Sequence, residues 1–296
     1  MIYLNGKKIY NMNIIKSKKA ALRRNGELMS KVFVIDVAKC SGCYNCQLAC
    51  KDEHCGNDWM PYAKPQPPTG QFWVKVNEHV EGTIPKVKIH YMTQMCNHCD
   101  DPVCIKVCGR YAITKRDDGL VIIDPDECAG CTACMQVCPY GVIYKNEELG
   151  ICQKCTGCAH LLDNGAKLPR CVEACPTDAL RFGEKEDFGT ELDNAVRFDK
   201  NGTGPNVYYL NVPGKFIAGT IFDPVEQEVI IGGKVTATCG AEKVIVETDD
   251  FGDFWLKDLK VGVYDVTICA DGFKTKTFTA VDTHESINLG DIPMEK

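Results

Sequence analysis

Short apolar runs, each close to a cysteine, recur along the N-terminal part of the chain. Residues 32–40, VFVIDVAKC, and residues 120–128, LVIIDPDEC, both read as a short strand followed by Ile-Asp, three further residues and a cysteine. A second pattern, with two apolar residues four and five positions after a cysteine, occurs at 108–113, 138–143 and 175–180. Repeats of this kind indicate a duplicated structural unit, which here begins and ends on cysteine beside a short strand.

The repeat is interrupted by a segment without cysteines between residues 60 and 92. Its first part, MPYAKPQPPTG, is rich in proline, and two β-patterned runs follow on either side of Glu81-Gly82. This pattern predicts a loop and a β-hairpin inserted into the repeat. Such a hairpin either offers a surface to a partner or covers the core, and the sequence leaves both interpretations open.

The cysteine groups stop after residue 183, and the pattern then changes twice. Residues 184–214 are polar and rich in glycine, which predicts an irregular linker. Residues 215–296 contain short β-rich runs separated by turn residues, the pattern of a small β-sandwich. We expect Cys239 and Cys269 in this region to be small buried apolar residues, because neither has a cysteine or histidine nearby in sequence.

The patterning therefore predicts an α+β protein with two folded domains. The predicted organisation is a basic N-terminal extension at 1–30, a cysteine-rich domain at 31–183, a linker at 184–214 and a β-sandwich domain at 215–296. Residues 1–31 hold eight lysines or arginines against one glutamate, which is typical of a disordered extension and leaves a docking arm as the alternative. Met29 stands just before the first strand-like run and is an alternative start.

Twenty of the 296 residues are cysteine, and most of them fall in Cys-x-x-Cys groups. That spacing favours metal binding over structural disulfides. The net charge of −6 and the acidic C-terminal region argue against a nucleic-acid-binding face. No apolar run reaches about 18 residues and none follows Arg23-Arg24, so we expect a cytoplasmic protein without a membrane span of its own.

Two of the cysteine groups have the spacing found in bacterial ferredoxins. They are Cys40, Cys43, Cys46 and Cys50 in the first group, and Cys128, Cys131, Cys134 and Cys138 in the third. In the run Cys-x2-Cys-x2-Cys-x3-Cys, three thiolates bind one [4Fe–4S] cluster and the fourth binds another, because the chain has left the cluster-binding loop by then. Zinc is disfavoured, since its structural sites usually take two separated pairs of ligands.

The second group widens the middle spacing and keeps the last one. It consists of Cys96, Cys99, Cys104 and Cys108. His98 lies inside this loop, but histidine rarely binds such clusters outside Rieske-type sites, so we expect a loop residue rather than a ligand. His54 and His160 receive the same interpretation.

The last group holds five cysteines where four are needed. Every other group separates its third and fourth cysteines by three residues, and here only Cys171 and Cys175 do so. The first two ligands must then come from Cys152, Cys155 and Cys158.

A glycine resolves this choice. In the first and third groups Gly42 and Gly130 precede the second cysteine, as expected where the backbone passes close to a cluster. Gly157 takes that place only if the pair is Cys155 and Cys158. Cys152 is then an extra thiol, and Cys55 is another.

Four groups of four cysteines supply the ligands of four [4Fe–4S] clusters. If groups two and three exchange their last cysteines, and groups one and four do likewise, four ligand sets result. They are set A, with Cys40, Cys43, Cys46 and Cys175; set B, with Cys50, Cys155, Cys158 and Cys171; set C, with Cys96, Cys99, Cys104 and Cys138; and set D, with Cys108, Cys128, Cys131 and Cys134. No iron keeps an open position, and the sequence contains no Walker loop or Ser-His-Asp constellation. We therefore expect an electron-transfer chain whose reaction occurs on a partner.

The four groups in this order resemble the iron–sulfur subunit of molybdenum- or tungsten-bis-pterin oxidoreductases. That family includes dimethyl sulfoxide, polysulfide and arsenate reductases and formate dehydrogenases. The resemblance covers about residues 31–183 and implies a double ferredoxin-like domain with four clusters, docked on a large catalytic subunit that carries the metal–pterin cofactor. The C-terminal region resembles the prealbumin-like or carboxypeptidase-regulatory-like sandwich through Asp-x-x-Gly-x-Phe at 249–254 and Gly-x-Tyr-x-Val at 262–266.

Within that family the chain is most similar to the small subunits of pyrogallol–phloroglucinol transhydroxylases. The likeness rests on VIDVAKC, KDEHCGNDWMPY, CPYGVIYKNEE and QKCTGCAHLLD, and on the appended sandwich. It implies a partner that acts on hydroxylated aromatics. Transhydroxylase small subunits are expected to lack part of the cysteine set, whereas all sixteen are present here, which suits net electron flow such as a reductive dehydroxylase needs. A respiratory reductase subunit and a free polyferredoxin carrier are the alternatives.

Overall fold

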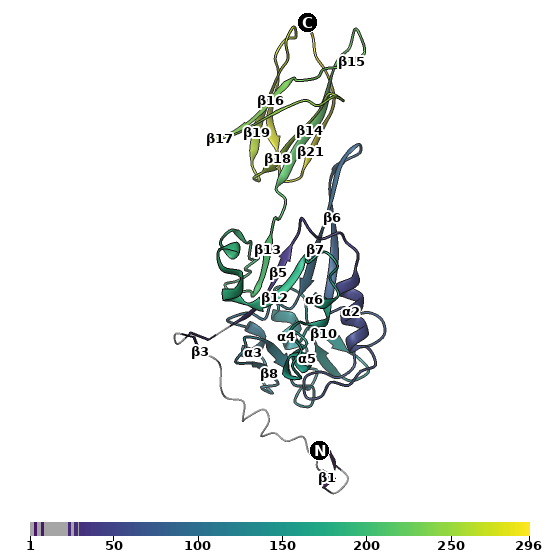
Figure 1. Ribbon diagram of the computed structural model, residues 1–296, viewed down its shortest axis with the longest axis vertical. Coiled ribbons are helices and arrows are strands. Elements are labelled where there is room, and N and C mark those ends of the chain that lie inside the picture. Colours follow the sequence, from purple (N-terminus) through teal and green to yellow (C-terminus); the bar gives the residue numbers. More distant parts are fainter. Residues whose placement is uncertain (1–2, 5–6, 9–22, 25–26, 29) are drawn as a thin grey trace. The chain divides into compact units, whose positions relative to one another are not determined.

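The computed structural model describes residues 3–4, 7–8, 23–24, 27–28 and 30–296 (Figure 1). By its contacts the chain divides into two compact units, Met1–Asn77 with Thr93–Leu210 and Glu78–Met92 with Asn211–Lys296. The predicted disorder of the N-terminal extension falls mostly on residues outside the described ones. The described parts of this extension are the short pairs of β1 (Tyr3–Leu4) with β2 (Lys7–Lys8) and of β3 (Arg23–Arg24) with β4 (Glu27–Leu28).

The first unit contains a three-stranded sheet with β5 (Lys31–Asp36) in the middle. On one side β12 (Leu180–Glu184) pairs with β5 antiparallel, and on the other side β13 (Val207–Leu210) pairs with it in parallel. The residues of β5 after Lys31 are all buried, as expected for a central strand flanked on both sides.

The strand β13 lies inside the segment 184–214 that the sequence predicted to be an irregular linker. Its four residues, VYYL, are all buried, and they follow the 3-10 helix η1 (Lys185–Asn194). The polar composition around this short apolar run concealed it, because its burial depends on pairing with β5 from the other end of the domain. Much of the predicted linker therefore belongs to the first unit.

Short hairpins and helices carry the cysteine groups. The hairpins pair β8 (Ile113–Lys115) with β9 (Val121–Ile123) and β10 (Tyr144–Asn146) with β11 (Ile151–Gln153). The helices are α2 (Asn45–His54), α3 (Val103–Lys106), α4 (Ala133–Val137), α5 (Ala159–Asp163) and α6 (Arg170–Glu173). Because α2 packs against α6 and α3 against α4, the first cysteine group lies beside the fourth and the second beside the third.

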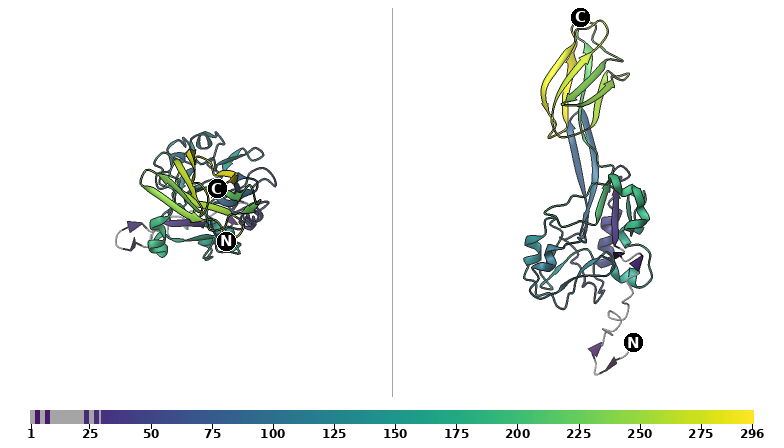
Figure 2. Two further views of the ribbon diagram at one scale, coloured as in Figure 1. Left: turned by 90° about the horizontal axis from the view of Figure 1, so that it is seen from above. Right: turned by 90° about the vertical axis from the view of Figure 1, so that its left-hand side faces the viewer.

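The predicted inserted hairpin is present as β6 (Val74–Thr83) and β7 (Lys86–Met95), whose strands run side by side in Figure 2. Its base belongs to the first unit, where Val76 N–H donates to the side chain of Gln47 (2.8 Å). Its distal part, residues 78–92, belongs to the second unit. There Lys215 Nζ donates to Glu81 Oε1 (2.8 Å), and Lys86 forms an ion pair with Asp253.

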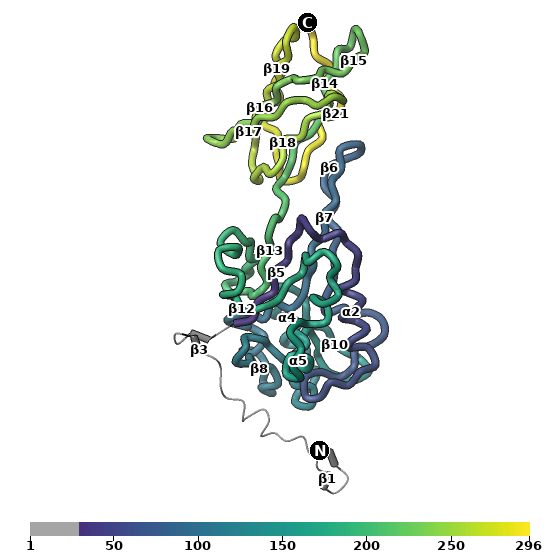
Figure 3. Tube along the Cα trace, viewed as in Figure 1, coloured from purple at the N-terminus to yellow at the C-terminus, as the bar shows by residue number. Residues whose placement is uncertain are grey.

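The second unit is a β-sandwich, visible as the upper strands in Figure 3. One sheet has β14 (Lys215–Asp223) paired with β15 (Glu228–Val229), β18 (Asp253–Leu259) and β21 (Ile287–Pro293). The other has the order β17 (Glu242–Glu247), β16 (Lys234–Cys239), β19 (Val263–Cys269) and β20 (Lys276–Asp282). The apolar core between them includes Ile217, Val235, Leu256, Val266 and Ile268.

The prediction for the two sandwich cysteines was wrong for Cys269, which is exposed. Alternate side chains of a strand point to opposite faces, so the burial of Ile268 turns its neighbour outward. Cys239 is partly buried and packs against the sandwich core.

Candidate metal centres

The four thiols of set A line one cavity. Cys40 follows β5, Cys43 and Cys46 flank the start of α2, and Cys175 lies between α6 and β12. Burial raises the pKa of Cys46 to about 11, and the nearby Cys40 and Cys175 add to the rise. For Cys175 the effect of burial is outweighed by backbone hydrogen bonds, first that of Leu180, which lower its pKa. Cys43 is exposed, so this cavity reaches the surface.

The thiols of set B are all buried. Cys50 comes from α2, Cys155 and Cys158 from the turn between β11 and α5, and Cys171 from α6. Burial raises the pKa of Cys155 to about 11 and that of Cys158 to about 12. It raises the pKa of Cys50 and Cys171 well above the usual value, and the neighbouring thiols of the same set contribute. Such thiols keep their protons at neutral pH unless a metal replaces them.

Set C joins the end of the inserted hairpin to α3 and α4. Burial raises the pKa of Cys99 to about 12, with Cys96, Cys104 and Cys138 all acting on it. Burial likewise raises the pKa of Cys104 to about 11, with contributions from Cys96 and Cys138. The structure therefore brings these four thiols together, although Cys138 belongs to a different group in the sequence.

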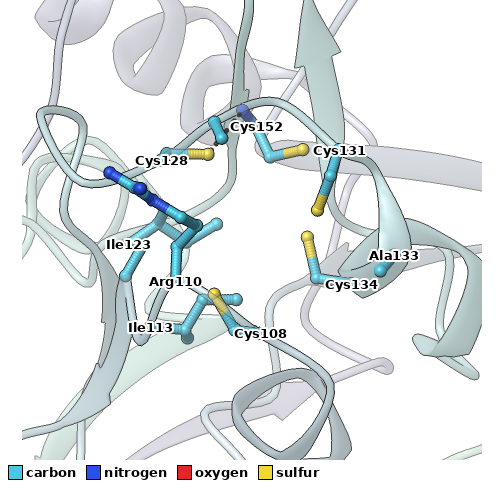
Figure 4. Close-up of a pocket in the computed structure, with 11 residues that line it drawn as sticks. Cys108, Arg110, Ile113, Ile123, Cys128, Cys131, Ala133, Cys134 and Cys152 are labelled. Carbon is cyan, nitrogen blue, oxygen red and sulfur yellow. Dashed lines mark hydrogen bonds between the residues drawn. The ribbon is translucent and has the colours of Figure 1, made fainter.

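The thiols of set D line a second cavity, shown in Figure 4. Three of them, Cys128, Cys131 and Cys134, belong to the loop before α4 and to its start, and Cys108 comes from the turn after α3. A fifth thiol, that of Cys152 on β11, lines the same cavity. Cys131 is exposed, so this cavity also reaches the surface.

The extra thiol Cys152 thus lies beside set D and not beside its sequence neighbour Cys155. Its backbone N–H donates to the sulfur of Cys128 (3.3 Å). A hydrogen bond between the thiols of Cys152 and Cys134 raises the pKa of Cys134 and lowers that of Cys152. Sequence spacing could not reveal this contact, because it arises where β11 passes the loop of another cysteine group. The other extra thiol, Cys55, lines neither cavity.

Neighbouring thiols connect each set to the next. The interactions of this kind are Cys46 with Cys50 between sets A and B, Cys155 with Cys96 between sets B and C, and Cys134 with Cys104 between sets C and D. The sets therefore follow the order A, B, C, D. The exposed Cys43 stands at one end of this row and the exposed Cys131 at the other.

The donor chemistry fits iron–sulfur clusters. In residues 30–296 and the short described segments before them, no three His, Cys, Asp or Glu side chains converge on a point that could hold one metal ion. The thiols of sets A and D instead line cavity walls, which suits a cluster of several irons. Close backbone approach supports this fit, because a Cβ on Gly130 would stand 2.0 Å from the carbonyl oxygen of Gly150.

The three histidines considered from the sequence are all buried. His98 accepts the Val121 N–H at Nδ1 (2.9 Å), while its Nε2 has no partner among the described residues. His160 Nε2 lies 3.0 Å from the Glu53 carboxylate. His54 Nε2 lies 3.9 Å from the sulfur of Cys158, a contact with set B that sequence reasoning missed, and burial lowers the pKa of His54 to about 3.

Two family domains match the chain. Residues 87–185 match the 4Fe-4S dicluster domain, and residues 217–294 match the carboxypeptidase regulatory-like domain, which confirms the predicted C-terminal sandwich. In the described part of the chain, no helix has the length and apolar character to cross a membrane. The cytoplasmic location stays a prediction.

Several iron–sulfur subunits are similar to the chain over much of their length. The pyrogallol hydroxytransferase small subunit of Pelobacter acidigallici is 36% identical over 278 residues, which cover 88% of this chain and 98% of that protein. The arsenate respiratory reductase iron-sulfur subunit of Shewanella sp. is 34% identical over 233 residues, covering 60% of this chain and 94% of that protein. A subunit of the anaerobic dimethyl sulfoxide reductase of Escherichia coli K12 is 41% identical over 170 residues, covering 53% and 74%.

Proposed function

Because this protein belongs to the family of 4Fe-4S dicluster electron-transfer subunits of molybdenum–pterin oxidoreductases, we propose that it holds four [4Fe–4S] clusters and conducts electrons to or from a catalytic partner. The observation that carries this proposal is the row of four thiol sets, each adjoining the next through a pair of neighbouring thiols. Carriers that stand this close allow an electron to pass along the row one step at a time.

The sixteen thiolates of sets A to D hold the irons, and each [4Fe–4S] cluster supplies one-electron oxidation and reduction when bound. The protein adds hydrogen bonds to sulfur, such as Gly157 N–H to Cys155 Sγ and Cys152 N–H to Cys128 Sγ, both 3.3 Å. Donors of this kind stabilise the thiolate and the added electron. The exposed Cys43 and Cys131 mark the two ends where electrons enter and leave.

The reaction itself belongs to a large partner subunit with a molybdenum- or tungsten-pterin cofactor. We propose a hydroxylated aromatic as its substrate, in a transhydroxylase-like or dehydroxylase-like reaction. In support, the pyrogallol hydroxytransferase small subunit aligns over 88% of this chain, whereas the arsenate and dimethyl sulfoxide reductase subunits align over 60% and 53%. A respiratory reductase is the second candidate, because those subunits match the cysteine-rich region equally well in identity.

Anaerobic purification of the chain from its native host tests the proposal. We expect a stable complex with a large subunit, molybdenum or tungsten in that complex, and about sixteen irons on this chain, four for each cluster. Turnover of the complex with a hydroxylated aromatic, and none with arsenate or dimethyl sulfoxide, distinguishes the two candidates. A stable carrier that purifies without a partner would contradict the proposal.

A further inference from the structure

One lysine is buried in the middle of the row of thiol sets. Lys154 is only 2% exposed. Its ammonium donates to the backbone carbonyl oxygen of Cys155 (3.1 Å) and to that of Val121. Among the described residues, no carboxylate lies within ion-pair distance of it. A buried charge without an acidic partner is costly, so an anionic neighbour is expected to stabilise it.

The neighbours of this ammonium are thiols of two different sets. Burial raises the pKa of Cys104 in set C and of Cys155 in set B, and the Lys154 ammonium opposes that rise at both. Sets B and C are the two middle sets of the row, and they adjoin each other through Cys155 and Cys96. Lys154 is therefore placed at the junction between the two halves of the row.

The fold holds this lysine firmly. Its acceptor Val121 lies on β9, and the N–H of the same residue donates to the buried ring of His98 (2.9 Å). The turn that follows Lys154 packs directly on this strand region, because a Cβ on Gly157 would come within 2.7 Å of the Leu120 side chain. The ammonium thus has a fixed place between the two sets and cannot swing out to solvent without opening that packing.

We infer that Lys154 is the cation that sets the reduction potentials of the two central clusters, an inference that rests on the proposed cluster content. Reduction adds one negative charge to a cluster. A fixed positive charge nearby stabilises the reduced form, and it acts more strongly in a buried site than at the surface, because water there does not screen it. Its removal makes both central clusters harder to reduce. Lys154 acts through its charge and not as an iron ligand.

The inference is tested with Lys154→Met in the intact, anaerobically purified complex. Redox titration followed by EPR should show the equilibrium of at least one central cluster shifted tenfold or more toward the oxidised form, which is a potential lower by about 59 mV for one electron. Lys154→Arg, which keeps the charge, should retain potentials near those of the wild type. The control is Lys106→Met, because Lys106 lies in α3 two positions after Cys104 but its side chain is 58% exposed.

A second variant keeps the test decisive if Lys154→Met does not assemble. Lys154→Gln is neutral but can still donate to a carbonyl, so it should lower the potentials as well. Wild-type potentials in an assembled Lys154→Met or Lys154→Gln protein, or a shift in Lys106→Met of equal size, would overturn the inference. A wild-type protein without [4Fe–4S] signals would instead refute the proposed function, and the inference with it.

Discussion

At the scale of single residues, neighbours in the sequence serve different centres. Cys152 and Cys155 are three positions apart, yet the first lines the cavity of set D and the second is buried with set B. The chain turns between them, so the strand β11 ends beside one set and the loop after it enters another. The same turn places Lys154 between the sets.

This division predicts opposite effects of two serine substitutions. Cys155→Ser removes an iron ligand and should lose or convert one [4Fe–4S] cluster. Cys152→Ser removes only a hydrogen-bond partner of Cys134 and should keep all four clusters, with at most a small shift in potential. Iron analysis and low-temperature EPR of the two reduced proteins measure this. Loss of a cluster in Cys152→Ser and four clusters in Cys155→Ser would show that the ligand register is wrong.

A second prediction at this scale concerns Gly130, which has a φ of +64° and leaves no room for a Cβ beside Gly150. Gly130→Ala should displace the backbone of the loop that holds set D and lower the iron content of the protein. The matched control is Gly141→Ala, because Gly141 has a similar φ of +62° but no atom within 4 Å of the point where a Cβ would stand. That control should cost only the backbone strain of about 1–2 kcal/mol. Equal iron loss in both would assign the effect to strain alone.

At the scale of elements, the inserted hairpin serves both units of the chain. The distal parts of β6 and β7 belong with the sandwich, where the side chain of Lys86 is 8% exposed and pairs with Asp253. Burial raises the pKa of Asp253, but hydrogen bonds from Lys86 and Thr220 outweigh it and lower that pKa. The two interpretations left open by the sequence, a partner surface or a core cover, both omitted this contact.

The ion pair predicts that Lys86→Met destabilises the second unit by about 2 kcal/mol, since it leaves a partly buried carboxylate without its charged donor. Hydrogen–deuterium exchange in the full chain should show faster exchange in β6, β7 and β18 and unchanged exchange around the cysteine groups. Lys243→Met, at an exposed position on β17, is the control and should leave these rates unchanged. Unchanged exchange in Lys86→Met would mean that the pair contributes nothing to the stability of this unit.

At the scale of the whole molecule, the sixteen cysteines of sets A to D all lie in the first unit, and the second unit contributes β-structure without any of these ligands. Electron transfer and the sandwich thus belong to different units of one chain. The family match at 87–185 and the match at 217–294 reflect the same division.

The basic N-terminal region gives the prediction at this scale. A protein that begins at Met29 should bind the same iron and the same large subunit as the full chain, because the ligand sets and their packing begin with β5. Iron per chain and co-purification of the large subunit measure this. If truncation keeps the iron but loses the partner, residues 1–28 are a docking arm.

Local spacing was enough to find the cysteine groups. A cluster-binding loop is a short stretch of chain, so the distances between its ligands are written in the sequence. Period-two patterning likewise predicted the inserted hairpin and the C-terminal sandwich, since each strand buries alternate residues. The surroundings of Cys152, Lys154 and His54 could not be predicted, because each is in contact with residues far away in the chain.

The sequence by itself determined which cysteines form each group, to which family the protein belongs and where the sandwich begins, because these depend on spacing and alternation over a few residues. Only the tertiary structure decided the rest. It brings β13 to the edge of β5, assigns the distal hairpin to the second unit, seats a fifth thiol beside set D and buries a lysine between sets B and C. Each of these depends on strand pairing or packing between distant segments, and no pattern local to either segment contains it.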